Sequence, residues 1–250
     1  MKNPVTGEIV STADRLNQVV ETARRAEKLG FDSFSVGERH AGEFVSSSPP
    51  TTVLAAIAAV TSRIRLQTGV TVLSVLDPVR VAEDYATIDQ LSRGGRLELV
   101  IGKGNEVLQY PLFGLSLDDQ WDLLAEKYAL LRTLWRKESV TWSGRFRSPL
   151  TEPTTTTPRP FAGSPRIWHG SATTLTSAAL AAKWGGDPLF TANAIQPPRK
   201  LQGLDRPLPP RVRASRARSA TPVPRRGQRR RRCFHCGHHS GSHPSVRACL

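Results

Sequence analysis

The chain has 250 residues, 38% of them hydrophobic, and a formal net charge of +14 at pH 7. No apolar stretch reaches the roughly 20 residues that cross a bilayer, and the polar N-terminus lacks a signal-peptide pattern, so we expect a cytoplasmic protein without membrane contact. The last 52 residues carry 14 of the 35 Lys and Arg but one of the 21 Asp and Glu. The net charge therefore describes this tail, and it is no sign that the nearly neutral body, residues 1–198, binds nucleic acid.

The body begins with helix and strand signals that alternate. Ser11 and Asp14 form a capping box for a helix that ends at Gly30, as is typical of helix termini. A strand is predicted at 31–36, and a Pro-initiated, Ala-rich helix at 48–60. The alternation indicates an α/β fold.

Residues 61–105 predict a strand, a helix and a second strand. The run 64–73 is rich in apolar and β-branched residues, which is typical of strands covered on both faces in a parallel sheet. Asp77 and Pro78 start the helix, and Gly94 and Gly95 end it, before a strand at 97–101. The stripe predicted to be buried on this helix consists of Val81, Tyr85, Ile88 and Leu91.

The rest of the body continues the alternation. Ser116 with Asp119 predicts the start of a long helix, 140–146 a small surface hairpin, 166–169 a strand, 173–184 a helix and 188–191 a last strand. We interpret three aromatic residues of the long helix as core: Trp121, Tyr128 and Trp135. Short joints, and the absence of a Gly-x-Gly-x-x-Gly turn after any strand, favour a barrel over a doubly wound sheet.

Four segments carry a family resemblance because they occur together and in order. They are Glu38-Arg39-His40, residues 63–105, VTWSGRF at 140–146 and PRIWHGSAT at 165–173. Together they resemble the luciferase-like, flavin-dependent monooxygenases, which fold as a (β/α)8 barrel. The likeness runs from about residue 4 to Pro198.

The resemblance implies an incomplete (β/α)8 TIM-type barrel. Residues 1–198 would supply about strands 2 to 6, and residues 199–250 would be a disordered, Arg/Pro-rich basic tail. An open parallel barrel has two unpaired edges, so we expect poor solubility or dependence on a partner. Because strands are missing, the alternative is that the chain is truncated and inactive.

Site residues in this fold follow the strands at their carboxyl ends. The family usually has Glu-His-His where this chain has Glu38-Arg39-His40, and a guanidinium does not deprotonate near neutral pH. Glu38 and His40 are therefore the catalytic candidates that face the substrate. The alternative is that Glu38 pairs with Arg39 and that His40 fills the barrel mouth.

The resemblance also places cofactor contacts. Gly69 and Val70 match a non-proline cis peptide that supports the flavin ring, and Lys103, between two glycines, matches a basic residue on the flavin phosphate. Ser171 and Thr173 match a phosphate seat at a helix start, where free N–H groups favour anions. Asn193 would lie beside the ring. The alternatives are ordinary strand ends, a solvated lysine and a simple helix cap.

The tail holds a competing motif. All three cysteines and four of the six histidines lie in it, and with the arginines before them they suggest a zinc- or nucleic-acid-binding module. A single Cys-x-x-Cys is a weak signal, so we assign no metal ligand. We favour a high-GC reading frame translated out of register as the origin of the tail, because it has almost no acidic residues and no apolar order.

The function that follows is oxidation of a small organic substrate by O2 and reduced FMN, with F420 as the less favoured cofactor. The resemblance implies a separate flavin reductase as a partner and leaves a homodimer open. Nucleic acid is expected only through the tail.

Overall fold

The structure is a computed structural model, and it describes residues 7, 9–41, 49–171, 175–183, 188–191 and 233–236. These residues fall into two compact units. The first unit comprises residues 1–166 with 231–250, and the second comprises residues 167–230.

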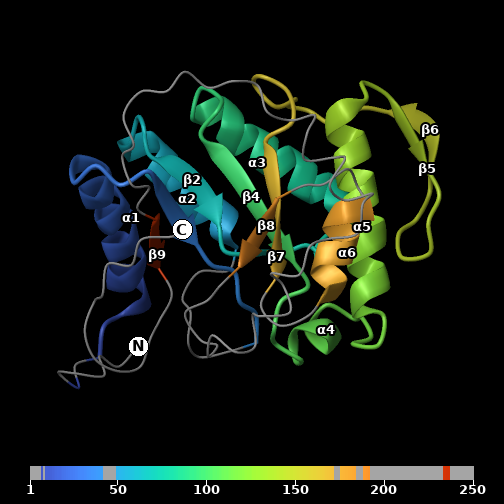
Figure 1. The fold of residues 1–250 in the computed structure, drawn as a ribbon, viewed down its shortest axis with the longest axis horizontal. Helices are drawn as coiled ribbons and strands as arrows, with labels where there is room; N and C mark the ends of the chain where they lie inside the picture. Colours follow the sequence, from blue (N-terminus) through green and yellow to red (C-terminus); the bar gives the residue numbers. More distant parts are fainter. Residues whose placement is uncertain are drawn as a thin grey trace. The chain divides into compact units, whose positions relative to one another are not determined.

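The first unit contains a parallel sheet. Its strands β1 (Ser33–Val36), β2 (Arg65–Thr68) and β4 (Leu97–Gly102) pair in that order, and β3 (Thr71–Val72) pairs further along β4. Each of these pairings is parallel (Figure 1). Connections between parallel neighbours require crossovers, which the helices supply. The predicted α/β class with a parallel sheet is confirmed.

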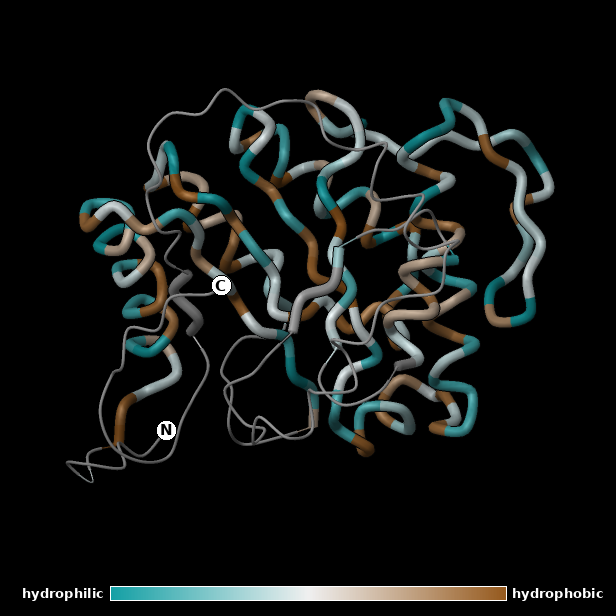
Figure 2. The backbone as a smooth tube through the Cα atoms, viewed as in Figure 1, coloured by the Kyte–Doolittle hydropathy of each residue, from teal (hydrophilic) through white to brown (hydrophobic). Residues whose placement is uncertain are grey.

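Helices of the first unit lie side by side over this sheet. They are α1 (Thr12–Lys28), α2 (Pro50–Val60), α3 (Pro78–Leu91) and α5 (Gln120–Arg136), with the short α4 (Gln109–Leu112) before α5. Helix α1 contacts α2, α2 contacts α3, and α3 contacts α5 (Figure 1). Hydrophobic and hydrophilic positions alternate along α1 in Figure 2, as expected of a helix with one buried side.

The starts of α1 and α3 are those that the sequence predicts. The Ser11 hydroxyl accepts from the Asp14 N–H at 3.0 Å, and the Asp77 carboxylate accepts from the N–H groups of Val79 and Arg80 at 2.9 and 3.2 Å. These side chains satisfy donors that a helix leaves unpaired in its first turn. Gly30, with φ of 81°, follows α1.

Strand register divides the sheet into an apolar and a polar row. Phe34, Leu66 and Leu97 are cross-strand partners, and so are Ser35, Gln67 and Glu98. Because successive side chains of a strand point to opposite faces, the two rows lie on opposite faces of the sheet.

Three local predictions are wrong. Leu91 is 59% exposed although it was placed on the buried stripe of α3, because the stripe drifts off the core by the last turn. The hairpin is longer than 140–146, since β5 (Val140–Trp142) pairs with β6 (Leu150–Thr154). The Ser116 hydroxyl accepts from the Asp118 N–H, and Asp119, the residue before α5, makes no side-chain cap.

Glu27 fastens α1 to the segment that leads into β2. Its carboxylate accepts from the backbone N–H groups of Ser62, Arg63 and Ile64, with shortest distances of 3.0, 2.6 and 2.7 Å. These bonds lower the pKa of Glu27 against the opposing effect of burial, which is the larger single influence.

The second unit contains β7 (Arg166–Ser171), α6 (Leu175–Lys183) and β8 (Leu189–Thr191). Strands β7 and β8 are parallel, with Gly170 opposite Phe190. This strand, helix and strand follow the predicted order, and β7 extends two residues beyond the predicted end at residue 169.

Most of the tail, for which disorder is predicted, lies outside the described residues. Its one described segment, β9 (Cys233–Cys236), pairs in parallel with β1, with Ser33 opposite Cys233. Strand β1 thus has a parallel neighbour on each side, β2 and β9.

Candidate functional site

The carboxyl ends of β1, β2 and β4 bring five of the predicted site residues to one end of the sheet. Glu38 and His40 follow β1, Gly69 and Val70 follow β2, and Lys103 follows β4. Glycines at the strand ends allow these loops to pack closely against one another. A Cβ on Gly37 would lie 3.5 Å from the Gly69 carbonyl oxygen, and a Cβ on Gly102 would lie 3.1 Å from a Val70 methyl group.

Glu38 and His40 form a buried carboxylate–imidazole pair. Glu38 Oε1 lies 2.8 Å from His40 Nε2, and Glu38 Oε2 accepts from the Val72 N–H at 2.8 Å. The Glu38 side chain is 0% exposed and that of His40 is 11% exposed. The Phe113 ring packs edge-on against His40 with 4.8 Å between centroids.

Arg39 contacts the loop after β4. Its guanidinium lies 2.6 Å from Glu106 Oε1 and 3.3 Å from Asn105 Oδ1. The two Glu38 oxygens bond His40 and Val72. Arg39 thus joins the loops after β1 and β4 at the rim of the site.

The peptide bond between Gly69 and Val70 is cis, at the position where the resemblance places one. It divides the predicted strand 64–73 into β2 and β3. Beside it, the Thr71 and Tyr85 hydroxyls lie 2.7 Å apart. Burial, with the Glu38 carboxylate nearby, raises the pKa of Tyr85, so this hydroxyl stays protonated.

Lys103 is a half-buried cation with open donor positions. Its ammonium donates to the Gly104 carbonyl at 3.3 Å and lies 5.6 Å from the centroid of the Trp121 ring. No carboxylate of the described residues forms an ion pair with it. Burial lowers the pKa of Lys103, as expected of a cation removed from water without a counter-charge.

The remaining predicted site residues lie elsewhere in the chain. Ser171 is the last residue of β7, in the second unit, and is 3% exposed. Thr173 and Asn193 lie outside the described residues.

Sequence reasoning missed two aromatic residues of this site. Trp121 was assigned to the core, as Tyr128 and Trp135 were, but it is half-buried and faces Lys103, whereas the other two are 0% and 3% exposed. Phe113 covers His40 from a segment in which Val107, Leu108 and Leu112 are also exposed. The signal available in the sequence was the high apolar content of residues 107–113, just after a predicted strand end.

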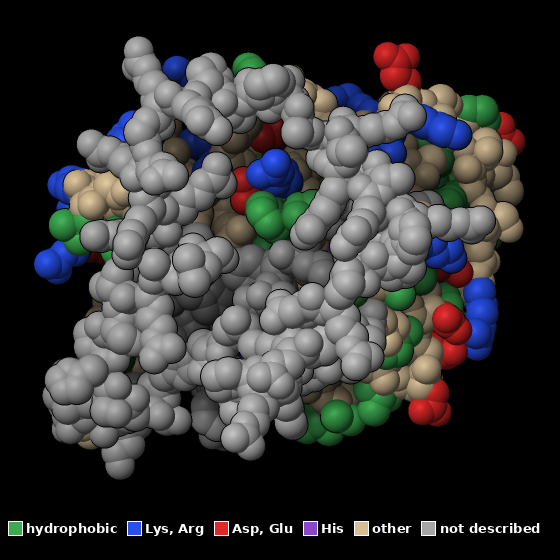
Figure 3. Space-filling view, viewed as in Figure 1, with side chains coloured by type: hydrophobic (Ala, Val, Ile, Leu, Met, Phe, Trp, Pro, Cys, Tyr) green, Lys and Arg blue, Asp and Glu red, His purple; other side chains and the backbone are tan. Residues whose placement is uncertain are grey.

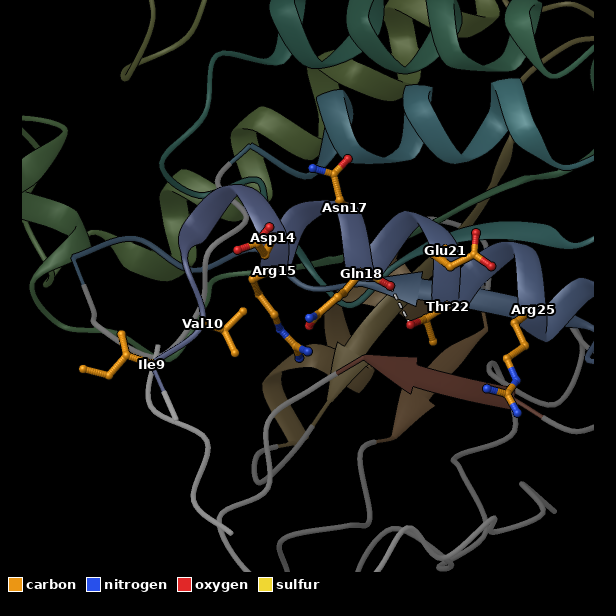
Figure 4. A pocket seen from close by; sticks show the side chains of 9 residues that line it. All are labelled: Ile9, Val10, Asp14, Arg15, Asn17, Gln18, Glu21, Thr22 and Arg25. Carbon is orange, nitrogen blue, oxygen red and sulfur yellow. Dashed lines mark hydrogen bonds between the residues drawn. The ribbon is translucent and has the colours of Figure 1, made fainter. Parts of the chain in front are cut away.

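A surface pocket lies away from the predicted site residues. It is lined by Ile9, Val10 and by polar and charged side chains of α1 (Figure 4). On the face shown in Figure 3, the described basic and acidic side chains are interspersed. No described helix combines the length and apolar character that spanning a membrane would demand.

The profile of the luciferase-like monooxygenase family matches residues 2–225. This chain belongs to the luciferase-like monooxygenase family. A solved family-like structure, the monooxygenase RslO1 from Streptomyces bottropensis, is 29% identical with a TM-score of 0.71, over 83% of this chain and 61% of that chain. The luciferase-like chain spans about half the length of the curated relatives it matches.

Two further likenesses concern the fold alone. The oxygenating constituent of 3,6-diketocamphane monooxygenase from Pseudomonas putida, in complex with FMN, is 20% identical with a TM-score of 0.62, over 72% of this chain and 52% of that chain. An F420-dependent secondary alcohol dehydrogenase is 23% identical with a TM-score of 0.62, over 81% and 60%. This fold therefore occurs with both flavin-type cofactors.

Proposed function

We propose that this luciferase-like chain holds reduced FMN at the carboxyl ends of β1, β2 and β4 and oxidises a small organic substrate with O2. Lys103 is the observation that carries the proposal. A half-buried ammonium without a carboxylate partner among the described residues is suited to an anionic ligand.

The residues of the first unit fit a flavin nucleotide. Lys103 would bind the phosphate, and Gly69 and Val70 would line the ring, as the resemblance implies. When bound, reduced flavin supplies the electrons that activate O2. Ser171 and Thr173 are proposed as further phosphate donors and Asn193 as a ring contact, on the resemblance alone.

Glu38 orients His40 in this proposal. Because an ionised carboxylate only accepts hydrogen bonds, the neutral imidazole carries its proton on Nε2 toward Glu38. Nδ1 is then the acceptor, and it can hold a proton from a substrate hydroxyl or a cofactor N–H group. Val72 fixes the second carboxylate oxygen, so the pair has one preferred orientation.

The apolar rim formed by Val107, Leu108, Leu112 and Phe113 fits an organic substrate. These side chains are 58%, 62%, 62% and 40% exposed, and Phe113 touches His40. Apolar surface beside the imidazole would bind the carbon skeleton of the substrate and exclude water.

FMN is proposed over F420, and a separate reductase is proposed as its source of electrons. A cytoplasmic location is proposed because residues 1–198 contain no cysteine, which is compatible with a reducing compartment. A homodimer stays open.

Flavin titration of the full chain tests the proposal. FMN is expected to bind more tightly than riboflavin, which lacks the phosphate. Lys103→Met should weaken FMN about 30-fold, the loss of about 2 kcal/mol expected for a charged hydrogen bond, and leave riboflavin unchanged. Lys137→Met, at an exposed lysine after α5, is the matched control. Equal affinity for FMN and riboflavin, or tighter binding of F420, would contradict the FMN proposal.

A further inference from the structure

The carbonyl oxygen of Lys103 is the target of three side chains. Ser74 Oγ lies 3.0 Å from it, Gln109 Nε2 lies 2.8 Å from it, and the Tyr110 hydroxyl lies 2.9 Å from it. The Ser74 and Tyr110 hydroxyls also lie 3.1 Å apart. All three side chains belong to buried residues, so the peptide plane after Lys103 is held from one side by groups that do not exchange with water.

This arrangement fixes where the opposite edge of the peptide points. In a trans peptide the C=O and N–H groups point in opposite directions. With the Lys103 carbonyl directed into the buried cluster, the Gly104 N–H is directed away from it. That N–H has no hydrogen-bond acceptor among the described residues. Gly104 has φ of 74°, a conformation that favours glycine.

A buried lysine on α5 also forms a hydrogen bond to this cluster. Lys127, on α5, is 6% exposed and donates from Nζ to the Ser74 carbonyl at 2.7 Å. Ser74 is thereby held through both its carbonyl and its hydroxyl. Asp77 and Glu126 are the acidic groups near Lys127, and neither forms an ion pair with it among the described residues.

We propose that Ser74, Gln109, Tyr110 and Lys127 form a clamp that turns the Gly104 N–H and the Lys103 ammonium toward a phosphate monoester. The clamp residues are positioning residues, because they act through the loop after β4 and do not touch the ligand. The inference rests on the proposed function for the identity of the ligand, and on the buried bonds to Lys103 for its mechanism.

Tyr110→Phe tests the clamp, since it removes one hydroxyl and keeps the ring. The variant is expected to bind FMN about 5- to 10-fold more weakly and riboflavin as before, in line with the loss of one hydrogen bond that orients a charged contact. In a Lys103→Met background, the same substitution should weaken FMN binding less than it does in the wild type, because only the Gly104 N–H contact is left to misplace. Tyr128→Phe removes another buried tyrosine hydroxyl, one bonded to Arg132, and is the matched control.

A second readout is independent of flavin. Inorganic phosphate is titrated into the full chain with ¹³C-dimethylated lysines, and the Lys103 signal is followed by NMR. We expect it to shift in the wild type and to shift less in Tyr110→Phe. If phosphate shifts the Lys103 signal in this way but the chain binds no flavin, the clamp is supported and the proposed function is refuted. Equal phosphate shifts in both proteins, no shift in either, or an equal loss of FMN and riboflavin affinity in Tyr110→Phe would overturn the clamp.

Discussion

Glu38 and Lys103 follow neighbouring parts of one sheet, yet their surroundings are opposite. The Glu38 side chain is 0% exposed, and both of its oxygens have partners in His40 and Val72. The Lys103 ammonium can donate three hydrogen bonds, and one acceptor, the Gly104 carbonyl, lies within reach among the described residues. A charge whose partners are complete holds the protein in place, whereas a charge with open positions is available to a ligand.

The largest expected effect is on stability, in Glu38→Ala. The substitution leaves the Val72 N–H and the His40 ring without their acceptor in a buried place. The free energy of unfolding should fall by about 4 kcal/mol, through unsatisfied donors and the cavity together. Urea denaturation measures this.

Lys103→Ala is the matched test, and it should change the free energy of unfolding by less than about 1 kcal/mol. A loss as large as that of Glu38→Ala would show that Lys103 has a structural partner and would break the comparison.

Lys127 sharpens the comparison, because it is a buried cation that donates to the Ser74 carbonyl. Burial lowers its pKa from 10.5 to about 8, against the attraction of Asp77 and Glu126. Between these values the unfolded chain binds more protons than the folded one, so stability rises with pH across that window. Relative to Lys127→Met, the wild type should gain up to about 3 kcal/mol from pH 8 to 10.5.

The measurement is the free energy of unfolding of both proteins at several pH values. Tyrosines that titrate in the same range are common to both and cancel in the difference. If the free energy of unfolding changes with pH in the same way in both proteins, Lys127 has its ordinary pKa in the folded state.

Gly104→Ala should perturb the open side of the comparison by a smaller amount. Its φ of 74° disfavours any Cβ, and the Cβ would collide with the Gln109 side chain. We expect a loss of about 2 kcal/mol in stability and weaker FMN binding. Gly114→Ala is the control, because it has a φ of 68° but nothing within 4 Å of its Cβ. Equal FMN affinity in the two variants would show that Gly104 takes no part in binding the ligand.

The smallest effect is expected for Glu106→Gln at the rim. The Arg39–Glu106 pair is 28% and 29% exposed, so its loss should cost less than about 1 kcal/mol and should fade at high salt. Thermal unfolding at low and high salt measures this. If the loss of stability persists in high salt, the Arg39–Glu106 pair behaves as a buried ion pair and the comparison must be revised.

Features that depend on neighbours in sequence could be predicted, as the start of α3 shows. Asp77 and Pro78 begin that helix because the cap is made by the next two N–H groups. The strands at 31–36 and 97–101 could be predicted because each follows glycines that end a helix, Gly30 and Gly94-Gly95. The candidate positions Glu38, His40 and Lys103 followed from where these strands end.

Features that depend on distant contacts could not be predicted. Nothing near Tyr110 or Ser74 indicates that their hydroxyls meet at the Lys103 carbonyl, because the three residues come from different segments. Trp121 looked like its neighbours on α5 until the position of Lys103 was known. The residues alone also do not show the break between β2 and β3, since Gly69-Val70 is compatible with a continuous strand; only the family resemblance placed a cis peptide there.

Glu27 has a consequence for the order of folding. Its three amide partners lie 35 to 37 residues along the chain, so the loop that it closes is short compared with the whole protein. Closing a short loop costs less entropy than bringing together distant segments. We expect α1, β1, α2 and the start of β2 to assemble first, as a nucleus onto which the strands that carry Lys103 are added later.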